Sequence, residues 1–427
     1  MAEPRSGGGK PRPGGSRPPA VLLGGEAIAV SAARSLAPTG VQVWALGDAT
    51  DPVQRSRHCH RFVEVGSKQG VQERYMAWLE SEGPRGAVIV PCDDDSVELV
   101  ARGRGRLEAL GYLPTEANDD ALLAMLDKER TYALCAEIGV PCPRTTTVTT
   151  RAEAERAAAL FDYPCALKPR ESHVFAAHFG ILAKAVRVHS PEELVSEFDR
   201  TAELGVSMLV TEIVPGGDDQ LCSYYSYLDE NGQPLYHFTK RKLRQYPPEF
   251  GLGCYQMTTW DPEVAELGLR FFQGANMRGI ANVEFKRDSR DGVLKLIESN
   301  VRLTAANEQV RLAGLDIPLL AYSRVTGTEP PELRSYRVGV PLWHPIEDVR
   351  SLLMYRRRGE VSVGEWLRSL RRRQRFALWR LDDPGPTIHS FSVKLRRRTG
   401  HSRKPSTASV TASVEAAADG SRTAVRS

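Results

Sequence analysis

The sequence has few cysteines, and they follow no metal-binding or redox pattern. The seven cysteines of the 427-residue chain are scattered, with no CxxC pair among them. An odd, unpatterned set argues against a disulfide framework and against a zinc site. No ordered Cys/His/Asn arrangement marks one thiol as a nucleophile. We therefore expect most of the cysteines to be small buried residues in a reducing compartment.

Long apolar runs are absent as well. No stretch approaches the about 18 uninterrupted apolar residues that a membrane-spanning helix requires. Residues 1–19 are rich in Gly, Pro, Arg and Ser and contain no run typical of a secretory signal. We expect a disordered tail there and a second one at residues 399–427, which are rich in Ser, Thr and Ala. These features predict a cytoplasmic protein.

Positive charge is unevenly distributed, although the net charge of the chain is only +4. Residues 356–398 contain thirteen Lys or Arg and four Asp or Glu, so the rest of the chain is slightly acidic. The sequence therefore predicts a small basic C-terminal unit at residues 330–398.

Residues 20–117 predict a parallel α/β domain. An apolar strand, a glycine pair, a helix and further apolar strands follow one another, at residues 20–23, 24–25, 28–36, 41–46 and 87–90. Gly24-Gly25 and Asp93 to Asp95 each follow a strand, where ligands bind in open α/β sheets. The alternative is that the glycines make tight turns and the aspartates cap a helix. A dinucleotide site is disfavoured because GxGxxG is absent.

The central part of the chain predicts two lobes with antiparallel sheets, at residues 118–205 and 206–329. The lobes begin with a helix from Asp119 to Ile138, which Gly139 ends. A second helix is expected at residues 191–204. The expected strands lie at residues 165–168, 181–188, 208–214, 221–228, 280–286 and 293–298.

Two polar strands predict a site for a divalent cation. Side chains alternate across a strand, so Asn282 and Glu284 share one face, and Glu298 and Asn300 share a face of the next strand. If the strands pair through the Asp291-Gly292 turn, two carboxylates and an amide oxygen converge. Mg²⁺ prefers such hard oxygen ligands together with nucleotide phosphates. The alternative is an exposed hairpin face with incidental acids.

Two lysines add to this pattern. Lys128 follows Asp127 in the predicted helix, and Lys168 ends the apolar run Cys165-Ala166-Leu167. A lysine that is buried at the end of such a strand needs an anionic partner, and a nucleotide phosphate is one. Either lysine alone is a surface charge more often than a ligand.

In motif order and spacing, the chain resembles the ATP-grasp superfamily from about Asn118 to Gly327, with the preceding α/β domain upstream. The resemblance implies a two-part ATP-grasp fold and the cofactors ATP and Mg²⁺, or alternatively Mn²⁺. It implies that Lys128 and Lys168 contact phosphates, and that a hinge of Thr211, Glu212, Ile213 and Val214 lines the adenine. Asp218 or Asp219 would bind ribose; Glu284, Glu298 and Asn300 would bind the metal ion, and Arg302 would face phosphate.

The chain also resembles carboxylate–amine ligases of the D-aspartate ligase type, through residues 239–248 and Asn300-Val301-Arg302. The resemblance implies that Lys240, Arg241 and Arg244 lie near the triphosphate or an acidic substrate, with Arg302, Lys168 and Arg241 as catalytic residues. The segment Arg170 to Gly180, with His173 and His178, departs from the glycine- and serine-rich flap of many relatives. The implied reaction activates a small carboxylate as an acyl phosphate and joins it to an amine.

Two alternatives remain open from the sequence. An ATP-grasp carboxylase would share the nucleotide half and differ in its acceptor, although no biotin-attachment segment is present. A nucleic-acid or membrane-surface binding protein would rest on the arginine clusters at residues 356–358, 371–375 and 396–398. Nucleic acid is the less expected partner, because such clusters are more often solvated helix faces.

Overall fold

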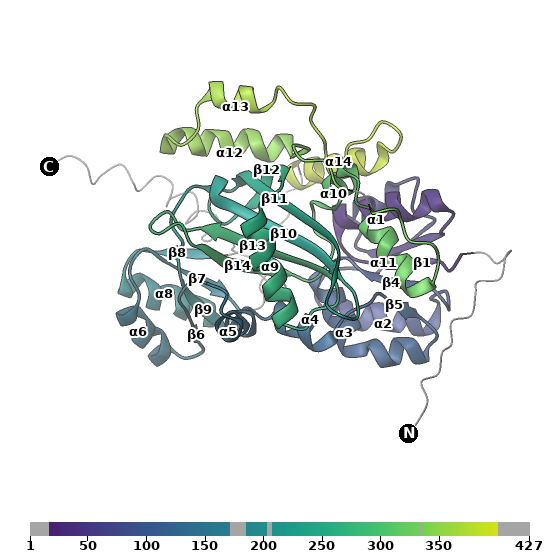
Figure 1. The fold of residues 1–427 in the computed structure, drawn as a ribbon, viewed down its shortest axis with the longest axis horizontal. Helices are drawn as coiled ribbons and strands as arrows, with labels where there is room; N and C mark the ends of the chain where they lie inside the picture. Colours follow the sequence, from purple (N-terminus) through teal and green to yellow (C-terminus); the bar gives the residue numbers. More distant parts are fainter. Residues whose placement is uncertain (1–16, 171–184, 203–206, 334, 400–427) are drawn as a thin grey trace.

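Three β-sheets organise the chain. A computed structural model describes residues 17–170, 185–202, 207–333 and 335–399 (Figure 1). The predicted combination of a parallel α/β domain with antiparallel sheets is confirmed. Among these residues, no helix has both the length and the apolar character needed to cross a bilayer.

The first sheet is parallel, with the strand order β3-β2-β1-β4-β5. Its elements are β1 (Ala20–Leu23), α1 (Glu26–Leu36), β2 (Val43–Gly47), β3 (Arg61–Glu64), α2 (Val71–Ser81), β4 (Val88–Pro91), α3 (Asp94–Ala109) and β5 (Leu113–Pro114). All four residues of β1 are buried, because helices cover both faces of the sheet. Ala20 and Leu22 pack in one core with residues of α1, while Val21 and Leu23 pack in another with residues of α2 and α3.

The second sheet is small and antiparallel, with the strand order β6-β9-β7-β8. Before and within it lie α4 (Asp119–Leu126), α5 (Lys128–Ile138), β6 (Thr145–Val148), α6 (Arg151–Leu160), β7 (Cys165–Pro169), β8 (Val186–Val188), α8 (Pro191–Ala202) and β9 (Met208–Glu212). Cys165 and Leu167 face a core formed with α6 and α8. Lys168 therefore lies on the opposite face of β7.

The prediction of one helix from Asp119 to Ile138 is wrong, because the helix breaks at Asp127. This residue has an extended backbone, with φ −97° and ψ 115°, and its side chain accepts a hydrogen bond from the Glu129 N–H. A side chain that caps the second helix in this way ends the first one. The predicted segments 181–184, 203–204 and most of the 170–180 loop, with His173 and His178, lie outside the described residues.

The third sheet has six strands in the order β14-β13-β10-β11-β12-β15. Its elements are β10 (Leu221–Leu228), β11 (Pro234–Tyr246), β12 (Leu252–Thr259), α9 (Pro262–Gly274), β13 (Gly279–Arg287), β14 (Leu294–Asn300), α10 (Asn307–Ala313), α11 (Ile317–Thr326) and β15 (Pro341–Trp343). On one face, Tyr224 packs against Phe272 of α9. On the other, Tyr225 and Phe238 join the core that also holds Leu22 of β1, so this sheet and the first one share buried residues.

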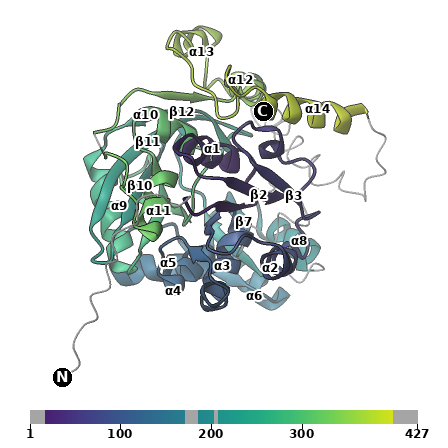
Figure 2. The same cartoon turned by 90° about the vertical axis from the view of Figure 1, so that its right-hand side faces the viewer.

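The last helices are α12 (Pro345–Arg358), α13 (Val363–Ser369) and α14 (Gly385–Thr399). They lie together at one end of the molecule in both views (Figures 1 and 2). Asp383, just before α14, accepts hydrogen bonds from Arg34 Nε at 2.9 Å, Ser56 Oγ at 2.8 Å and the Arg57 N–H at 3.0 Å. The end of the described chain is thereby joined to its first helix.

Candidate active site

Two carboxylates lie directly opposite each other on neighbouring strands. The predicted pairing of the two polar strands is confirmed, since β13 and β14 are antiparallel with Glu284 opposite Glu298 and Asn282 opposite Asn300. Like charges in such positions repel and destabilise a sheet unless a cation offsets them. Lys242 Nζ lies 2.7 Å from Glu284 Oε1 and offsets part of this charge.

The amide of Asn300 is oriented by its neighbour. Asn300 Nδ2 donates to Asn282 Oδ1 at 3.4 Å, and Asn282 Nδ2 donates to the Tyr224 carbonyl at 3.0 Å. Because the amide nitrogen is engaged, the oxygen of Asn300 is the atom left to bind a metal ion. No group of three or more His, Cys, Asp or Glu side chains with metal-site geometry occurs in the described part of the chain. Two carboxylates and one amide oxygen fit Mg²⁺, which takes its remaining ligands from water and phosphates.

The helix break brings Lys128 to this hairpin. Lys128 is the first residue of α5. The Tyr132 hydroxyl, one turn later, donates to the Ile297 carbonyl at 2.9 Å. Ile297 lies at a register irregularity, because Glu284 pairs with Glu298 while the next residue, Phe285, pairs with Leu296. The bulge thus supplies a free strand carbonyl that holds α5 against β14.

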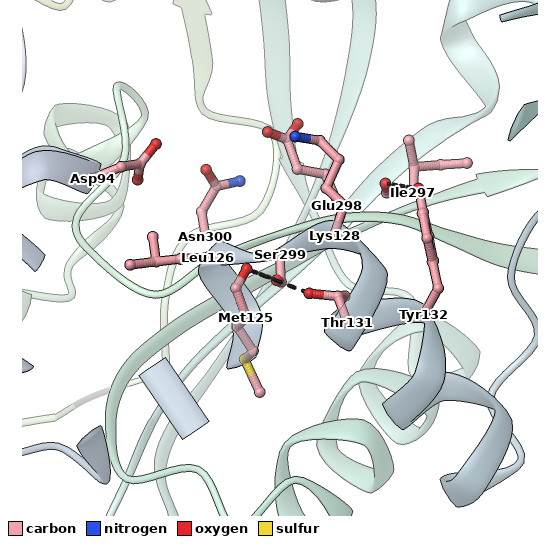
Figure 3. A pocket seen from close by; sticks show the side chains of 10 residues that line it. All are labelled: Asp94, Met125, Leu126, Lys128, Thr131, Tyr132, Ile297, Glu298, Ser299 and Asn300. Atoms are coloured by element: carbon pink, nitrogen blue, oxygen red, sulfur yellow. Dashed lines mark hydrogen bonds between the residues drawn. The ribbon is translucent and has the colours of Figure 1, made fainter. Parts of the chain in front are cut away.

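A small pocket joins three parts of the chain at this point (Figure 3). Its lining consists of Asp94, Met125, Leu126, Lys128, Thr131, Tyr132, Ile297, Glu298, Ser299 and Asn300. In the close view, the side-chain ends of Lys128 and Glu298 point toward the same space, and Asp94 approaches Asn300 from the other side. The pocket therefore combines a lysine of the first lobe with two of the three predicted metal ligands.

Arg170 ties the start of α5 to the end of β7. Its guanidinium donates to both carboxylate oxygens of Asp127, with Nε at 2.9 Å from each, and contacts Glu129 Oε2 at 2.6 Å. The Lys128 N–H also donates to the Arg170 carbonyl at 3.3 Å. Lys168 lies two residues before Arg170 and is half-buried on β7, outside the lining of the pocket.

Arg302 reaches the first domain. Its Nε donates to Asp94 Oδ1 at 2.6 Å and its Nη2 to Asp94 Oδ2 at 3.2 Å. Burial works against the charge of Arg302, but Asp94 outweighs it and raises the pKa of the guanidinium. A fork-shaped contact of this kind fixes the plane of the guanidinium at the edge of the pocket.

The capping interpretation of the Asp93 to Asp95 segment is confirmed. Asp93 caps α3, and Ser96 completes the capping box. The segment also lies at the carboxyl edge of the sheet, where Gly24 has φ +67° and a side chain there would overlap the Asp93 carboxylate at 2.1 Å. Asp94 was predicted only as part of the ligand-binding edge of the first sheet, and Lys242 was not predicted to belong to the site. Asp94 was recognisable from its position after a buried strand. Lys242 was recognisable because its spacing from Lys240 places both side chains on the same strand face.

The basic residues of β11 divide between the two faces of the sheet. Lys240 is opposite Ser223, which is itself opposite Glu284, so Lys240 shares the face of the carboxylates. Arg241 is opposite Cys222, a residue of the core beneath α9, and therefore points to the other face. The structure does not bring Arg241 to the predicted metal ligands. Arg244 is buried in an ion pair with Asp348 of α12, with Nε 2.7 Å from Oδ1.

Lys240 is an unusual lysine because it is 4% exposed. Burial lowers its pKa to about 7, and the positive charge of Lys242 adds to this effect. Its ammonium contacts Gln256 Oε1 and lies 5.6 Å from the centre of the Tyr225 ring. Such a lysine gains its proton most readily when an anion is brought nearby.

The predicted adenine hinge lies at the end of β9 and just beyond it. Thr211 is buried, with its hydroxyl 2.9 Å from that of Thr145. The Glu212 side chain contacts Arg290 and lies 3.4 Å from Lys295 Nζ. Beyond the strand, Ile213 is half-buried and Val214 is buried.

The two candidate ribose ligands differ in their surroundings. Asp218 is buried and accepts from Gln245 Nε2 at 2.8 Å, from the Glu249 N–H at 3.1 Å and from the Tyr355 hydroxyl. Asp219 is exposed. Asp218 thus serves to join β11 and α12, and Asp219 is the more accessible carboxylate.

Comparison with known proteins finds a relative in sequence and several in fold. No protein-family model matches the chain. The chain is 27% identical over 256 residues to a D-aspartate ligase of Enterococcus faecium; the alignment covers 58% of this chain and spans 59% of that protein.

Solved structures share the fold. A biotin carboxylase of Campylobacter jejuni has a TM-score of 0.58 at 16% identity over 75% of this chain and 74% of its own. An L-amino acid ligase of Bacillus licheniformis has a TM-score of 0.58 at 12% identity over 76% and 79%. The chain thus shares its fold with these two enzymes and is similar in sequence to a D-aspartate ligase, of which it spans about 59% of the length.

Proposed function

We propose that the chain is an ATP-dependent carboxylate–amine ligase that releases ADP and phosphate. The observation that carries this proposal is the register that sets Glu284 opposite Glu298, with Glu298 and Asn300 lining one pocket together with Lys128. Acidic side chains gathered in this way are costly unless a cation joins them. The D-aspartate ligase relationship supports a carboxylate and an amine as substrates.

Glu284, Glu298 and Asn300 would hold Mg²⁺, with Mn²⁺ as an alternative ion. When bound, the ion neutralises charge on the nucleotide phosphates. Lys128, at the start of α5, and Lys168, at the end of β7, would contact the phosphates from the first lobe. The contacts of Arg170 with Asp127 and Glu129 support this assignment, because they hold the start of α5 against the end of β7.

Residues 211–214 would line the adenine. The Glu212 carbonyl would accept from the exocyclic amine, and the Val214 N–H would donate to a ring nitrogen, a role closed to Pro215. We assign the ribose hydroxyls to Asp219, since the Asp218 carboxylate is buried among protein donors.

A carboxylate is a poor electrophile, so the proposed reaction first activates it. A substrate carboxylate oxygen attacks the γ-phosphorus, and the bond to the β–γ bridging oxygen breaks, giving an acyl phosphate and ADP. The amine nitrogen then attacks the acyl carbon, phosphate leaves with the bonding electrons, and the nitrogen loses a proton. Arg302, held by Asp94, would bind the substrate carboxylate or the acyl phosphate, and the lysines would neutralise the charge that develops on the transferred group.

The proposal is tested by measuring ADP and phosphate release from Mg·ATP with panels of amino acids, small dicarboxylates and amines. We expect release that needs both a carboxylate and an amine, with an amide product detected by mass spectrometry. A parallel assay with bicarbonate distinguishes a carboxylase from a carboxylate–amine ligase. Release that depends on bicarbonate and is indifferent to amines would overturn the ligase proposal.

A further inference from the structure

Exposed apolar side chains concentrate at one end of the molecule. Among the described residues, fifteen large apolar side chains are exposed, and ten of them lie between Ile346 and Leu395. Scattered surface leucines are ordinary, but a concentration of this kind marks an interaction surface. We call these ten residues and the exposed basic residues among them the C-terminal surface.

Two helices present an apolar stripe to solvent. On α12, Ile346, Val349 and Leu353 are 42%, 47% and 58% exposed, and on α14, Ile388, Phe391 and Leu395 are 62%, 61% and 52% exposed. In both helices these positions follow the spacing i, i+3 and i+7, which places them on one face. Each helix therefore turns an apolar face away from the protein.

These helices are firmly attached on their inner side. The carboxylate of Asp348 is fully buried and accepts from Arg244 Nε at 2.7 Å, Trp343 Nε1 at 2.9 Å and Trp366 Nε1 at 2.8 Å. Lys394 of α14 contacts Glu347 of α12 at 2.8 Å, so the two helices lie side by side at that point. The outward stripes thus belong to helices that are anchored to the rest of the protein, at the end of the molecule where both views place α12, α13 and α14 (Figures 1 and 2).

The same surface is strongly basic. The exposed cationic side chains among these helices and their connections are Arg350, Arg356, Arg357, Arg358, Arg368, Arg371, Arg372, Arg373, Lys394 and Arg396. Apolar residues that lie among arginines and lysines form the pattern of a helix that rests in the headgroup region of a membrane. The negative surface of an anionic bilayer attracts each such cation.

We propose that the C-terminal surface docks on an anionic lipid bilayer, with the apolar stripes of α12 and α14 entering the interface. Charge complementarity selects this occupant. A second copy would bring two basic surfaces together in a self-complementary dimer and so repel. A nucleic acid would match the arginines but would have no use for exposed aliphatic side chains such as Ile346 and Leu395, because base stacking uses aromatic or guanidinium planes.

Vesicle co-sedimentation of the full chain tests the proposal. We expect binding to phosphatidylcholine vesicles that contain phosphatidylglycerol, weakening between about 0.05 M and about 0.5 M NaCl as charges are screened. Vesicles of phosphatidylcholine alone should bind little.

Two triple variants separate the contributions of charge and apolar insertion. Arg371→Gln with Arg372→Gln and Arg373→Gln should weaken binding roughly 10- to 100-fold. Ile388→Ser with Phe391→Ser and Leu395→Ser should weaken it at least about 10-fold without changing the charge. ATP turnover should be unchanged in both, since these residues lie outside the active site.

Matched controls come from exposed residues elsewhere. Arg102→Gln with Arg106→Gln and Arg151→Gln removes three exposed arginines of other helices, and Leu160→Ser removes a 70% exposed leucine of α6. These controls should bind vesicles as the unmodified chain does. Three results would overturn the proposal: salt-independent or absent vesicle binding, duplex DNA binding that only the arginine triple variant loses, or a dimer in sedimentation that the apolar triple variant dissociates.

Discussion

At the scale of single residues, the candidate site depends on two carboxylates that share one position in a hairpin. Glu284 and Glu298 repel each other, and Lys242 offsets the charge of one of them. A cation that binds both carboxylates would convert this repulsion into attraction. Without such a cation, the paired carboxylates lower the stability of the protein.

This balance predicts opposite effects of one substitution. Glu298→Gln should reduce Mg-dependent ATP turnover about 100-fold or more, because it removes a metal ligand. It should leave the metal-free fold as stable as before or slightly more stable, because the carboxylate repulsion is relieved. Coupled ADP-release assays across Mg²⁺ concentrations and thermal unfolding in EDTA measure the two effects. Glu266→Gln, on the exposed side of α9, is the control, and equal turnover in both variants would contradict the assignment.

Lys240 makes stability depend on pH. Its pKa in the folded protein is lowered from 10.5 to about 7 by burial, so between these values the unfolded chain binds a proton that the folded chain does not. Stability therefore rises with pH across that interval, by up to about 1.4 kcal/mol per unit for this group. Lys240→Met should stabilise the metal-free protein near pH 7 and give a smaller gain near pH 10. Denaturant unfolding at both pH values measures the difference, and a gain that does not change with pH would contradict the lowered pKa.

At the residue scale, the sequence predicts what depends on local alternation. Glu284, Glu298 and Asn300 come together because side chains alternate and Asp291-Gly292 favours a turn. Arg241 shows where this reasoning ends: its neighbour Lys240 faces the carboxylates, and only the register with Cys222 places Arg241 on the other side. Which face of a long strand is which depends on distant partners that a single sequence does not display.

At the scale of elements, the break between α4 and α5 determines where Lys128 lies. Asp127 ends α4, caps α5 and binds Arg170 at the end of β7. A continuous helix would carry Lys128 past this junction. In a sequence pattern, Asp127 reads as an ordinary polar position of an amphipathic helix, so this break was not predicted.

Asp127→Ala tests the role of the break. It removes a cap worth about 1 kcal/mol and takes from Arg170 its carboxylate partner at position 127. We expect lower stability together with ATP affinity weakened roughly 10-fold, because Lys128 and Lys168 lose their common support. Thermal unfolding and calorimetric titration with an ATP analogue measure the two effects.

Thr150→Ala is the matched control, since Thr150 caps α6 in the same lobe through a capping box. It should lower stability by a similar amount and leave nucleotide affinity unchanged. If both variants bind the analogue equally well, the helix break has no part in the nucleotide site.

The longest strand was also missed at this scale. The charged run within β11, from Lys240 to Arg244, reads as a basic cluster, while in the fold Lys240, Lys242 and Arg244 are buried. Each cation meets its partner on another element: Gln256 of β12, Glu284 of β13 and Asp348 of α12. The predicted lobes with antiparallel sheets follow from strand composition, whereas a buried cation is recognisable only once its partner is known.

At the scale of the whole molecule, a buried ion pair joins the two ends of the described chain. Arg34 and Asp383 have side chains that are 0% and 1% exposed. Burial favours the neutral acid, but the hydrogen bonds from Arg57, Ser56 and Arg34 outweigh this effect and lower the pKa of Asp383. Removing one member leaves the other as an uncompensated buried charge.

Asp383→Ala should therefore lower the free energy of unfolding by about 3–5 kcal/mol. Asp382→Ala should change it by no more than about 0.5 kcal/mol, because this neighbour is half-exposed and pairs with Arg380 on the surface. Urea unfolding followed by circular dichroism compares the two variants. Equal unfolding midpoints would show that the Arg34–Asp383 ion pair contributes little to the free energy of unfolding.

The ion pair between Arg34 and Asp383 also sets an order of events during protein synthesis. Arg34 and Asp383 are 349 residues apart, so at about 5–20 residues per second Asp383 leaves the ribosome roughly 20 to 70 seconds after Arg34. The nascent first domain must spend that interval with a cation whose native partner has not yet been made. Helix α1 can thus complete its native contacts only after Asp383 has left the ribosome.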